Sequence, residues 1–171
     1  IVANMLQFKY QGKIFLVGRR PGTAFGLPIF PGLADLPEPV DLAVILAPAR
    51  VVPSLVRECG QLGISRVVVE SAGFSELNEA GGTLEAEVRA ALKQYGMRLV
   101  GPNCMGLVNT DPDVRLNATF APVYPPAGRV AMSSQSGALG LAILAVAHRL
   151  HLGVSTFVSV GNKADVSSND L

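Results

Sequence analysis

The stretch LAVILAPARVVPSLVRECGQLG, residues 42–63, carries the pattern that decides the fold. Its first residues, Leu42 to Leu46, are all aliphatic, which is typical of a strand covered on both faces in a parallel sheet. The strand stops at Pro48. Apolar residues then recur at helical spacing over residues 51–62, and Gly63 ends the helix. A fully buried strand followed at once by an amphipathic helix predicts one βα unit of an α/β fold.

The same kind of unit repeats along the chain. Further strands are predicted over residues 13–17, 66–70 and 97–100, and a second amphipathic helix over residues 83–95. The Gly- and Pro-rich segment 23–39 cannot form a long helix, so it is predicted to be a surface crossover. Because strands and helices alternate, the sequence predicts a doubly wound sheet of parallel strands.

Each predicted strand ends in a loop of small residues. These loops are GRRPG (residues 18–22), APAR (47–50), ESAGF (70–74) and GPNCMG (101–106). In open α/β sheets, ligands bind at the carboxyl ends of the strands. We therefore expect the four loops to share one rim and to form a binding site there.

A second unit follows the Pro-rich linker VYPPAG, residues 123–128. It consists of a strand over residues 129–132, the turn SSQSG (133–137), a helix over 138–150 and a strand over 155–160. The serines of the turn can simply cap the helix, or they can join the free N–H groups of its first turn to bind an anion. This repeat predicts two domains, at residues 1–123 and 124–171.

Composition narrows the classes of function. Apolar residues make up 49% of the chain and charged residues only 16%, with a formal net charge of +1. Because so few charges are available for the surface, we expect a partner domain or an oligomer to cover part of it. The small net charge and the lack of a basic run argue against nucleic-acid binding. The longest uncharged stretch, residues 130–147, contains the polar SSQSG turn, which argues against a membrane helix.

Cysteines and histidines are too scattered to predict a metal site. Cys59 and Cys104 lie far apart in the sequence, which predicts reduced thiols in a cytoplasmic protein. The first residues also lack the features of a signal peptide. His148 and His151 share one helix face, but no third ligand lies near them in the sequence. We expect both to be ordinary polar residues at a helix end.

Four longer motifs occur in a fixed order. They are GPNCMGLVNT (residues 101–110), LNATF (116–120), GRVAMSSQSGALG (128–140) and VSVGNKADV (158–166). Together they closely resemble the NDP-forming acyl-CoA synthetases, the branch of the succinyl-CoA synthetase superfamily that contains the ADP-forming acetyl-CoA synthetases. The resemblance implies a Rossmann-like CoA-binding domain followed by the N-terminal part of a flavodoxin-like ligase domain. It also implies that the first strand of the CoA-binding domain lies before Ile1.

The resemblance further implies an acid–thiol ligase. Enzymes of this family interconvert acyl-CoA, ADP and phosphate with acid, ATP and CoA, through an acyl phosphate and a phosphohistidine. The implied ligands are therefore CoA, an acyl group and phosphate, and the implied partner is an ATP-grasp domain or subunit that binds ATP or ADP with Mg²⁺. The phosphorylated histidine is expected beyond residue 171, so we expect this chain alone to be inactive.

Particular residues take roles through the resemblance. The positions implied for CoA are Arg19, Arg20, Pro48, Ser71, Gly73, Asn103 and Cys104. Those implied for phosphate are Ser134, Gln135, Ser136 and Gly137, and those of a loop near the phosphohistidine are Asn162, Lys163 and Asp165. Turn chemistry alone explains Pro48 and the last loop equally well. Cys104 has no activating histidine beside it in the sequence, so we expect it to line the thioester pocket rather than to act as a nucleophile.

Two other functions compete with the ligase. The same architecture occurs as a regulatory module fused to some protein acetyltransferases, where it need not ligate. A nicotinamide-dependent oxidoreductase is disfavoured, because the chain has no GxGxxG followed by an acidic residue about twenty positions later.

Overall fold

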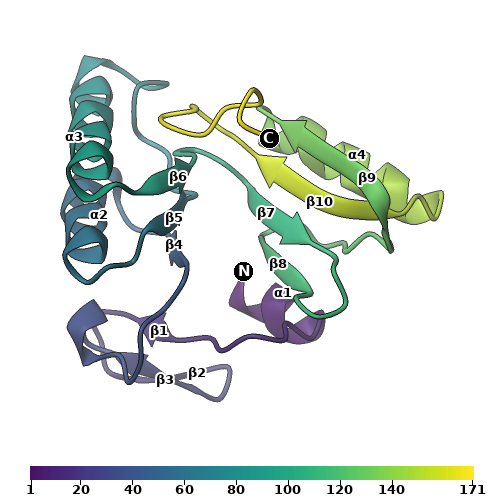
Figure 1. The fold of residues 1–171 in the computed structure, drawn as a ribbon, viewed down its shortest axis with the longest axis horizontal. Coiled ribbons are helices and arrows are strands. Elements are labelled where there is room, and N and C mark those ends of the chain that lie inside the picture. The colour runs from purple at the N-terminus through teal and green to yellow at the C-terminus, as the bar shows by residue number, and fades with distance from the viewer.

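The computed structural model covers residues 1–171 and contains the predicted parallel sheet (Figure 1). Its strands are β4 (Ala43–Ile45), β5 (Arg66–Val69) and β6 (Arg98–Val100), which lie side by side in that order. Both neighbouring pairs are parallel. The connecting helices, α2 (Val52–Gln61) and α3 (Glu79–Tyr95), pack against each other on one face of the sheet. The sequence therefore predicted the type and order of these five elements correctly.

A single apolar core joins this sheet to its helices. Val69 and Leu99 of the strands are fully buried, and they belong to one cluster with Val56 of α2 and Val88 of α3. The burial of these β-branched and aliphatic side chains removes apolar area from water and holds the layers together. The apolar faces of α2 and α3 therefore form one side of this core, and the strands of the parallel sheet form the other.

Helix α3 begins four residues earlier than the sequence pattern predicted. The cap residue is Asn78, whose side-chain Oδ1 accepts a 2.9 Å hydrogen bond from the N–H of Gly81. Gly81 lies so close to the preceding loop that a Cβ there would be 2.0 Å from the carbonyl oxygen of Phe74. Gly81 permits this close approach, although glycines in a sequence usually argue against a helix.

A second, mixed sheet contains four strands in the order β8-β7-β10-β9. Their bounds are Gly106–Asn109 for β7, Leu116–Thr119 for β8, Ala127–Ser134 for β9 and Val154–Ser159 for β10. Helix α4 (Gly137–Arg149) connects β9 to β10, which are parallel as predicted. The hairpin β7–β8 was not predicted, and β10 pairs with β7 in antiparallel fashion. This sheet therefore contains strands from both sides of the boundary expected between residues 123 and 124.

The N-terminal part forms a small helix and a separate sheet. Helix α1 (Val2–Gln7) lies against β8, and the strands β1 (Leu16–Val17), β2 (Gly22–Ala24) and β3 (Leu27–Phe30) form a sheet in the order β1-β3-β2. The segment expected to be a plain crossover thus contains the hairpin β2–β3. Proline at position 28 is compatible with the central strand β3 because β1 pairs with β3 only from Ile29 onward, so Pro28 lies outside that ladder.

An apolar cavity of about 710 Å³ separates β1 from the parallel sheet. Leu16 and Val17 line it from one side, and Ala43 to Ala47 line it from the other. Strand β1 pairs only with β3, and β4 pairs only with β5, so one edge of each strand has no partner.

The segment after β10 binds along the edge of β6 and connects the two sheets. The N–H of Ala164 donates to the carbonyl of Gly101 at 2.9 Å, and that of Val166 donates to the carbonyl of Leu99 at 3.1 Å. In return, the N–H of Leu99 donates to the Asp165 carboxylate at 2.8 Å. The parts of the chain before and after the linker therefore form one continuous structure. No helix in it is both long and apolar enough to cross a membrane.

Candidate functional site

The loop after β5 lies between the loops after β4 and β6 and bonds to both. The Ser71 hydroxyl accepts a 2.9 Å hydrogen bond from the N–H of Ala47, and the Ser71 carbonyl accepts one of the same length from the N–H of Asn103. Pro48 and Asn103 are exposed, while Ser71 and Gly73 are half-buried. Because the three strands are parallel neighbours, their loops share one edge, as the sequence predicted.

Gly73 gives this edge its shape. Its φ of +105° lies in the region that favours glycine, and a Cβ there would lie 3.1 Å from the Cβ of Ala49. The N–H of Gly73 donates to Glu76 at 2.6 Å, and the next N–H, that of Phe74, donates to the same carboxylate oxygen at 3.1 Å. The Glu76 side chain therefore closes the loop. Because Gly73 has no side chain, a ligand at this edge could approach its backbone closely.

Cys104 lines the inner wall of the same edge. Its side chain is only 5% exposed, and the thiol lies 3.3 Å from the carbonyl oxygen of Val69, to which it donates. Burial raises the pKa of the Cys104 thiol to about 12. A neutral, buried thiol is a poor nucleophile. This geometry favours the expected role of Cys104 as a wall.

The serine turn before α4 combines a cap with free backbone donors. Ser136 is the N-cap residue, and its hydroxyl accepts from the N–H of Leu139 at 3.3 Å. The Ser134 hydroxyl donates to the Ser136 carbonyl at 2.8 Å, which fixes the turn, and Gln135 is exposed. The first helical main-chain bond starts at Gly140, so earlier N–H groups such as that of Gly137 have no partner within the helix. Such groups, with the helix dipole, favour an anion.

Met105 connects the loop edge to the serine turn. A Cβ on Gly137 would lie 3.5 Å from the Cβ of Met105, which is an ordinary contact distance. The N–H of Met105 donates to the hydroxyl of Ser159 at the end of β10. The residue after Cys104 therefore packs against the start of α4. The loops expected to bind CoA and the turn expected to bind phosphate are neighbours in space, although about thirty residues separate them in the sequence.

The loop at residues 161–165 makes a third side of this region. Gly161 lies so close to the loop after β6 that a Cβ there would be 2.2 Å from the carbonyl oxygen of Pro102. Asp165 binds the N–H of Leu99 and the guanidinium of Arg98, so its carboxylate holds β6. Lys163 is exposed. These contacts give Asp165 a role in the packing of the two sheets.

Arg19 and Arg20 do not lie on the edge that the other loops share. Both are exposed and follow β1, which belongs to the separate N-terminal sheet. Neither arginine forms an ion pair within these 171 residues. The loop GRRPG therefore lies on the opposite side of the apolar cavity from the other three loops, since Val17 lines one side of the cavity and Ala47 the other.

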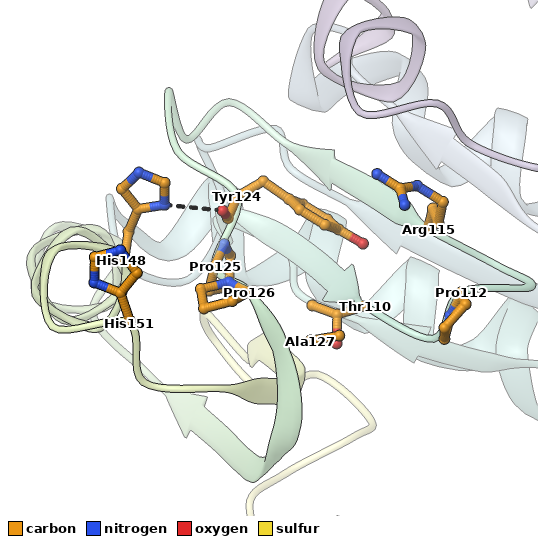
Figure 2. Close-up of a pocket in the computed structure, with 9 residues that line it drawn as sticks. All are labelled: Thr110, Pro112, Arg115, Tyr124, Pro125, Pro126, Ala127, His148 and His151. Carbon is orange, nitrogen blue, oxygen red and sulfur yellow. Dashed lines mark hydrogen bonds between the residues drawn. The ribbon is translucent and has the colours of Figure 1, made fainter.

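A second cavity of about 300 Å³ lies at the other end of α4 (Figure 2). Its walls include Arg115, Tyr124, His148 and His151, and a ring nitrogen of His148 lies 3.1 Å from the carbonyl oxygen of Tyr124. Helix α4 has 13 residues and is about 18 Å long, so His148 in its last turn lies far from the serine turn at its start. None of the residues that the sequence analysis assigned to CoA or phosphate lines this cavity.

Glu70 is a feature of the site region that the sequence analysis did not single out. It is 8% exposed, and neither carboxylate oxygen has a hydrogen-bond partner. Burial raises the pKa of Glu70 to about 8. The sequence did contain a signal for this buried glutamate. Glu70 directly follows the apolar run Val67 to Val69, and the strand pattern places it at the buried end of that strand.

Fold and site together define a class of protein: an α/β protein whose parallel strands end in one edge of loops, next to the start of a helix. Comparison with known families makes this specific. Residues 1–110 match the CoA-binding domain family, and the chain belongs to that family. Residues 127–171 match the succinyl-CoA ligase-like flavodoxin domain. The boundary expected between residues 123 and 124 falls in the interval between the two matches.

Several ADP-forming ligases are similar over the whole chain. The acetate–CoA ligase (ADP-forming) of Methanocaldococcus jannaschii is 42% identical over 171 residues, which are 100% of this chain and 23% of that protein. The alpha subunit of acetate–CoA ligase (ADP-forming) I from Pyrococcus furiosus is 40% identical over 175 residues, with 100% of this chain and 37% of that subunit covered. The chain thus spans between about a quarter and two fifths of the length of these relatives.

Solved structures agree with the sequence relatives. The dinucleotide-forming acetyl-coenzyme A synthetase 1 of Ca. Korarchaeum cryptofilum superposes with a TM-score of 0.91 at 36% identity, covering 99% of this chain and 36% of that one. The same enzyme in complex with phosphate and ADP matches equally well. An ATP citrate lyase from Methanothrix soehngenii, at 17% identity and a TM-score of 0.57, shares the fold.

Glu70 makes the stability of the chain depend on pH. The folded pKa is about 8, above the ordinary value of 4.5, so the folded state keeps its proton while the unfolded state loses it between these pH values. Stability should therefore fall as pH rises from 5 to 8, by up to roughly 1.4 kcal/mol per pH unit. Glu70→Gln should flatten this slope in urea unfolding at pH 5, 6.5 and 8, whereas Glu79→Gln, at an exposed position, should not. An unchanged slope in Glu70→Gln would refute the assignment.

The cysteines should be unreactive in the folded chain. Burial raises the pKa of Cys59 to about 11 and that of Cys104 to about 12, so almost no thiolate exists at pH 7.5. Iodoacetamide at that pH should leave both residues unmodified over an hour and should modify both in urea, as intact mass shows. Rapid labelling of Cys104 in the folded chain would contradict its role as a wall.

Proposed function

We propose that this chain forms the CoA-binding part, and the start of the phosphate-binding part, of an ADP-forming acyl-CoA synthetase. The observation that carries the proposal is the contiguity of the loop edge and the serine turn through Met105 and Gly137. A reaction between a CoA thioester and phosphate needs both ligands side by side, which this arrangement provides. Identities near 40% to ADP-forming acetate–CoA ligases over the whole chain support the same function.

In this proposal, phosphate attacks the carbonyl carbon of the acyl-CoA thioester. A carbon–oxygen bond forms, the carbon–sulfur bond breaks, and the CoA sulfur leaves with the bonding electrons and takes up a proton. The products are an acyl phosphate and free CoA. The main-chain N–H groups at the start of α4 would hold the phosphate oxygens, since they are directional donors with no helical partner. Met105 and Cys104 would line the pocket around the thioester and keep water out.

The remaining steps belong to parts of the parent enzyme outside these residues. There, the acyl phosphate transfers its phosphoryl group to a histidine, releasing the acid, and the phosphohistidine then converts ADP to ATP. We assign this phosphorylated histidine, the ATP-grasp domain or subunit, and the site for nucleotide with Mg²⁺ to those parts. His148 and His151 lie at the far end of α4 from the serine turn, which suits neither of them for the phosphoryl transfer.

The site residues are proposed as follows. Pro48, Ser71, Gly73, Asn103 and Cys104 shape the CoA edge, and Ser134, Gln135, Ser136 and Gly137 form the phosphate turn. One of Arg19 and Arg20, which lie across the apolar cavity from the other loops, would meet the CoA phosphates. Lys163 is exposed and available to a phosphate. A cytoplasmic location suits the two free thiols. The acetyltransferase module is not favoured, because the relatives that match the whole chain are named as ligases.

Binding by the chain itself tests the ligand. Isothermal titration should show CoA binding more tightly than NAD, because three of the four expected loops form the edge and no dinucleotide fingerprint exists. The affinity for CoA should be weak, in the range of about 0.1–1 mM, as expected when part of a site is missing. Adenosine 3′,5′-bisphosphate serves as the matched anion control. Tighter binding of NAD than of CoA would refute the proposal.

Gly137 tests the phosphate turn in the parent enzyme. The structure has room for a Cβ at this position, so Gly137→Ala should fold normally, but its methyl group would crowd an anion at the helix start. Gly137→Val should crowd the anion further. Each lost hydrogen bond to an anion costs about 1.5–3 kcal/mol, so turnover should fall about ten- to a hundredfold while the Kd for CoA stays within twofold. Steady-state kinetics and CoA titration would measure both. Intact turnover with weakened CoA binding would make the turn a plain helix cap.

A further inference from the structure

The side chain of Asn162, on the segment after β10, is bonded to both CoA loops. Its Nδ2 donates to the carboxylate of Glu76, just beyond the loop at residues 70–74, and to that of Glu85 at 3.2 Å. Its Oδ1 accepts from Nδ2 of Asn103 at 3.3 Å, on the loop at residues 101–106. One half-buried amide thus connects two loops that follow different strands of the parallel sheet.

Glu76 connects the Asn162 side chain to the backbone of the loop after β5. One of its carboxylate oxygens accepts from the N–H groups of Gly73 and Phe74, and the other accepts from Asn162. Burial by itself would raise the pKa of Glu76, but the hydrogen bonds from Asn162 and the backbone bring the pKa below its ordinary value. The carboxylate is therefore ionised at neutral pH. A charged acceptor bonded on both sides fixes the position of the Gly73 N–H.

Glu85 holds the other half of the arrangement. It accepts a 2.6 Å hydrogen bond from the Ser75 hydroxyl and forms a 2.9 Å ion pair with Arg89. Burial acts to raise the pKa of Glu85, yet its hydrogen bonds bring the net pKa below the ordinary value. Asn162 therefore lies between two carboxylates and supplies N–H donors to both. A carboxylate in the place of this amide would face two negative charges.

The backbone around Asn162 leaves this side chain little freedom. The N–H of Asn162 donates to the carbonyl of Pro102 at 2.9 Å, and Gly161 fits against the same carbonyl. Arg89 also donates to the carbonyl of Ala164. The loop that carries Asn162 is thus anchored by its main chain, independently of the Asn162 side chain.

We propose that Asn162 is a positioning residue for CoA: it holds the loops at residues 70–76 and 101–106 at a fixed separation, so that CoA affinity depends on a residue of the ligase-like segment. The proposal rests on the proposed function. It implies that any movement of the 161–165 loop changes the CoA edge, because the contact runs through Glu76 to the Gly73 N–H.

The test compares Asn162→Asp with a matched control in the parent enzyme. Asn169→Asp introduces the same charge at an exposed position of the same segment. Asn162→Asp should raise the KM and the Kd for CoA about tenfold, since it replaces charge-assisted hydrogen bonds by repulsion. The KM for phosphate and the kcat should stay within twofold, as should all constants of Asn169→Asp.

Rescue identifies the contact itself. In the double variant Asn162→Asp/Glu76→Gln, the amide introduced at position 76 can donate to the carboxylate introduced at position 162, while its oxygen still accepts from Gly73. The KM for CoA should return to within about threefold of wild type. Thermal unfolding shows whether each variant is folded. A loss shared equally by kcat and all KM values, or no rescue by Glu76→Gln, would overturn the proposal. If the wild-type parent does not bind CoA at all, the proposed function is overturned together with this proposal.

Discussion

The main-chain bonds between residues 99–102 and 162–166 are the constraint on which the rest of the structure depends. They run along the free edge of β6 and fix the direction in which the chain leaves β10. Gly161 makes this approach possible, because any Cβ would collide with the backbone after β6. With this contact in place, Met105 meets the start of α4 and Asn162 reaches the loop after β5. Both predicted ligand sites thereby become parts of one surface.

Much of the parallel sheet could be predicted because its information is local. The aliphatic runs around Val44, Val68 and Leu99 and the periodic helices between them need no knowledge of distant partners. The edge formed by the loops after these strands follows from the rule that parallel neighbours end together. The cap at Ser136 was also predictable, since serine is among the preferred residues at a helix N-cap.

The missed features depend on distant contacts or on residues with two meanings. The hairpin β7–β8 gains its stability from pairing with β10, and no short window of sequence contains that partner. The hairpin β2–β3 lies among glycines and prolines, which indicate loops more often than strands. Arg19 and Arg20 follow a strand, as predicted, but the strand belongs to another sheet. The contact between Glu76 and Asn162 spans 86 positions. The resemblance indicated Asn162 as part of a site loop, but nothing in the sequence indicated Glu76 as its partner.

The pairing of β7 with β10 also governs the order in which the molecule can fold. Each strand of the parallel sheet meets the next one through a single intervening helix, whereas β7 must wait for a strand about fifty residues later. Long-range pairing of this kind is slow, because the chain entropy of the loop is lost before any contact forms. The loop edge of the parallel sheet therefore depends on shorter-range pairing than β7 does. The edge of β7 that pairs with β10 stays unpaired until β10 is present. The ligase-like segment therefore packs onto a parallel sheet that has already formed.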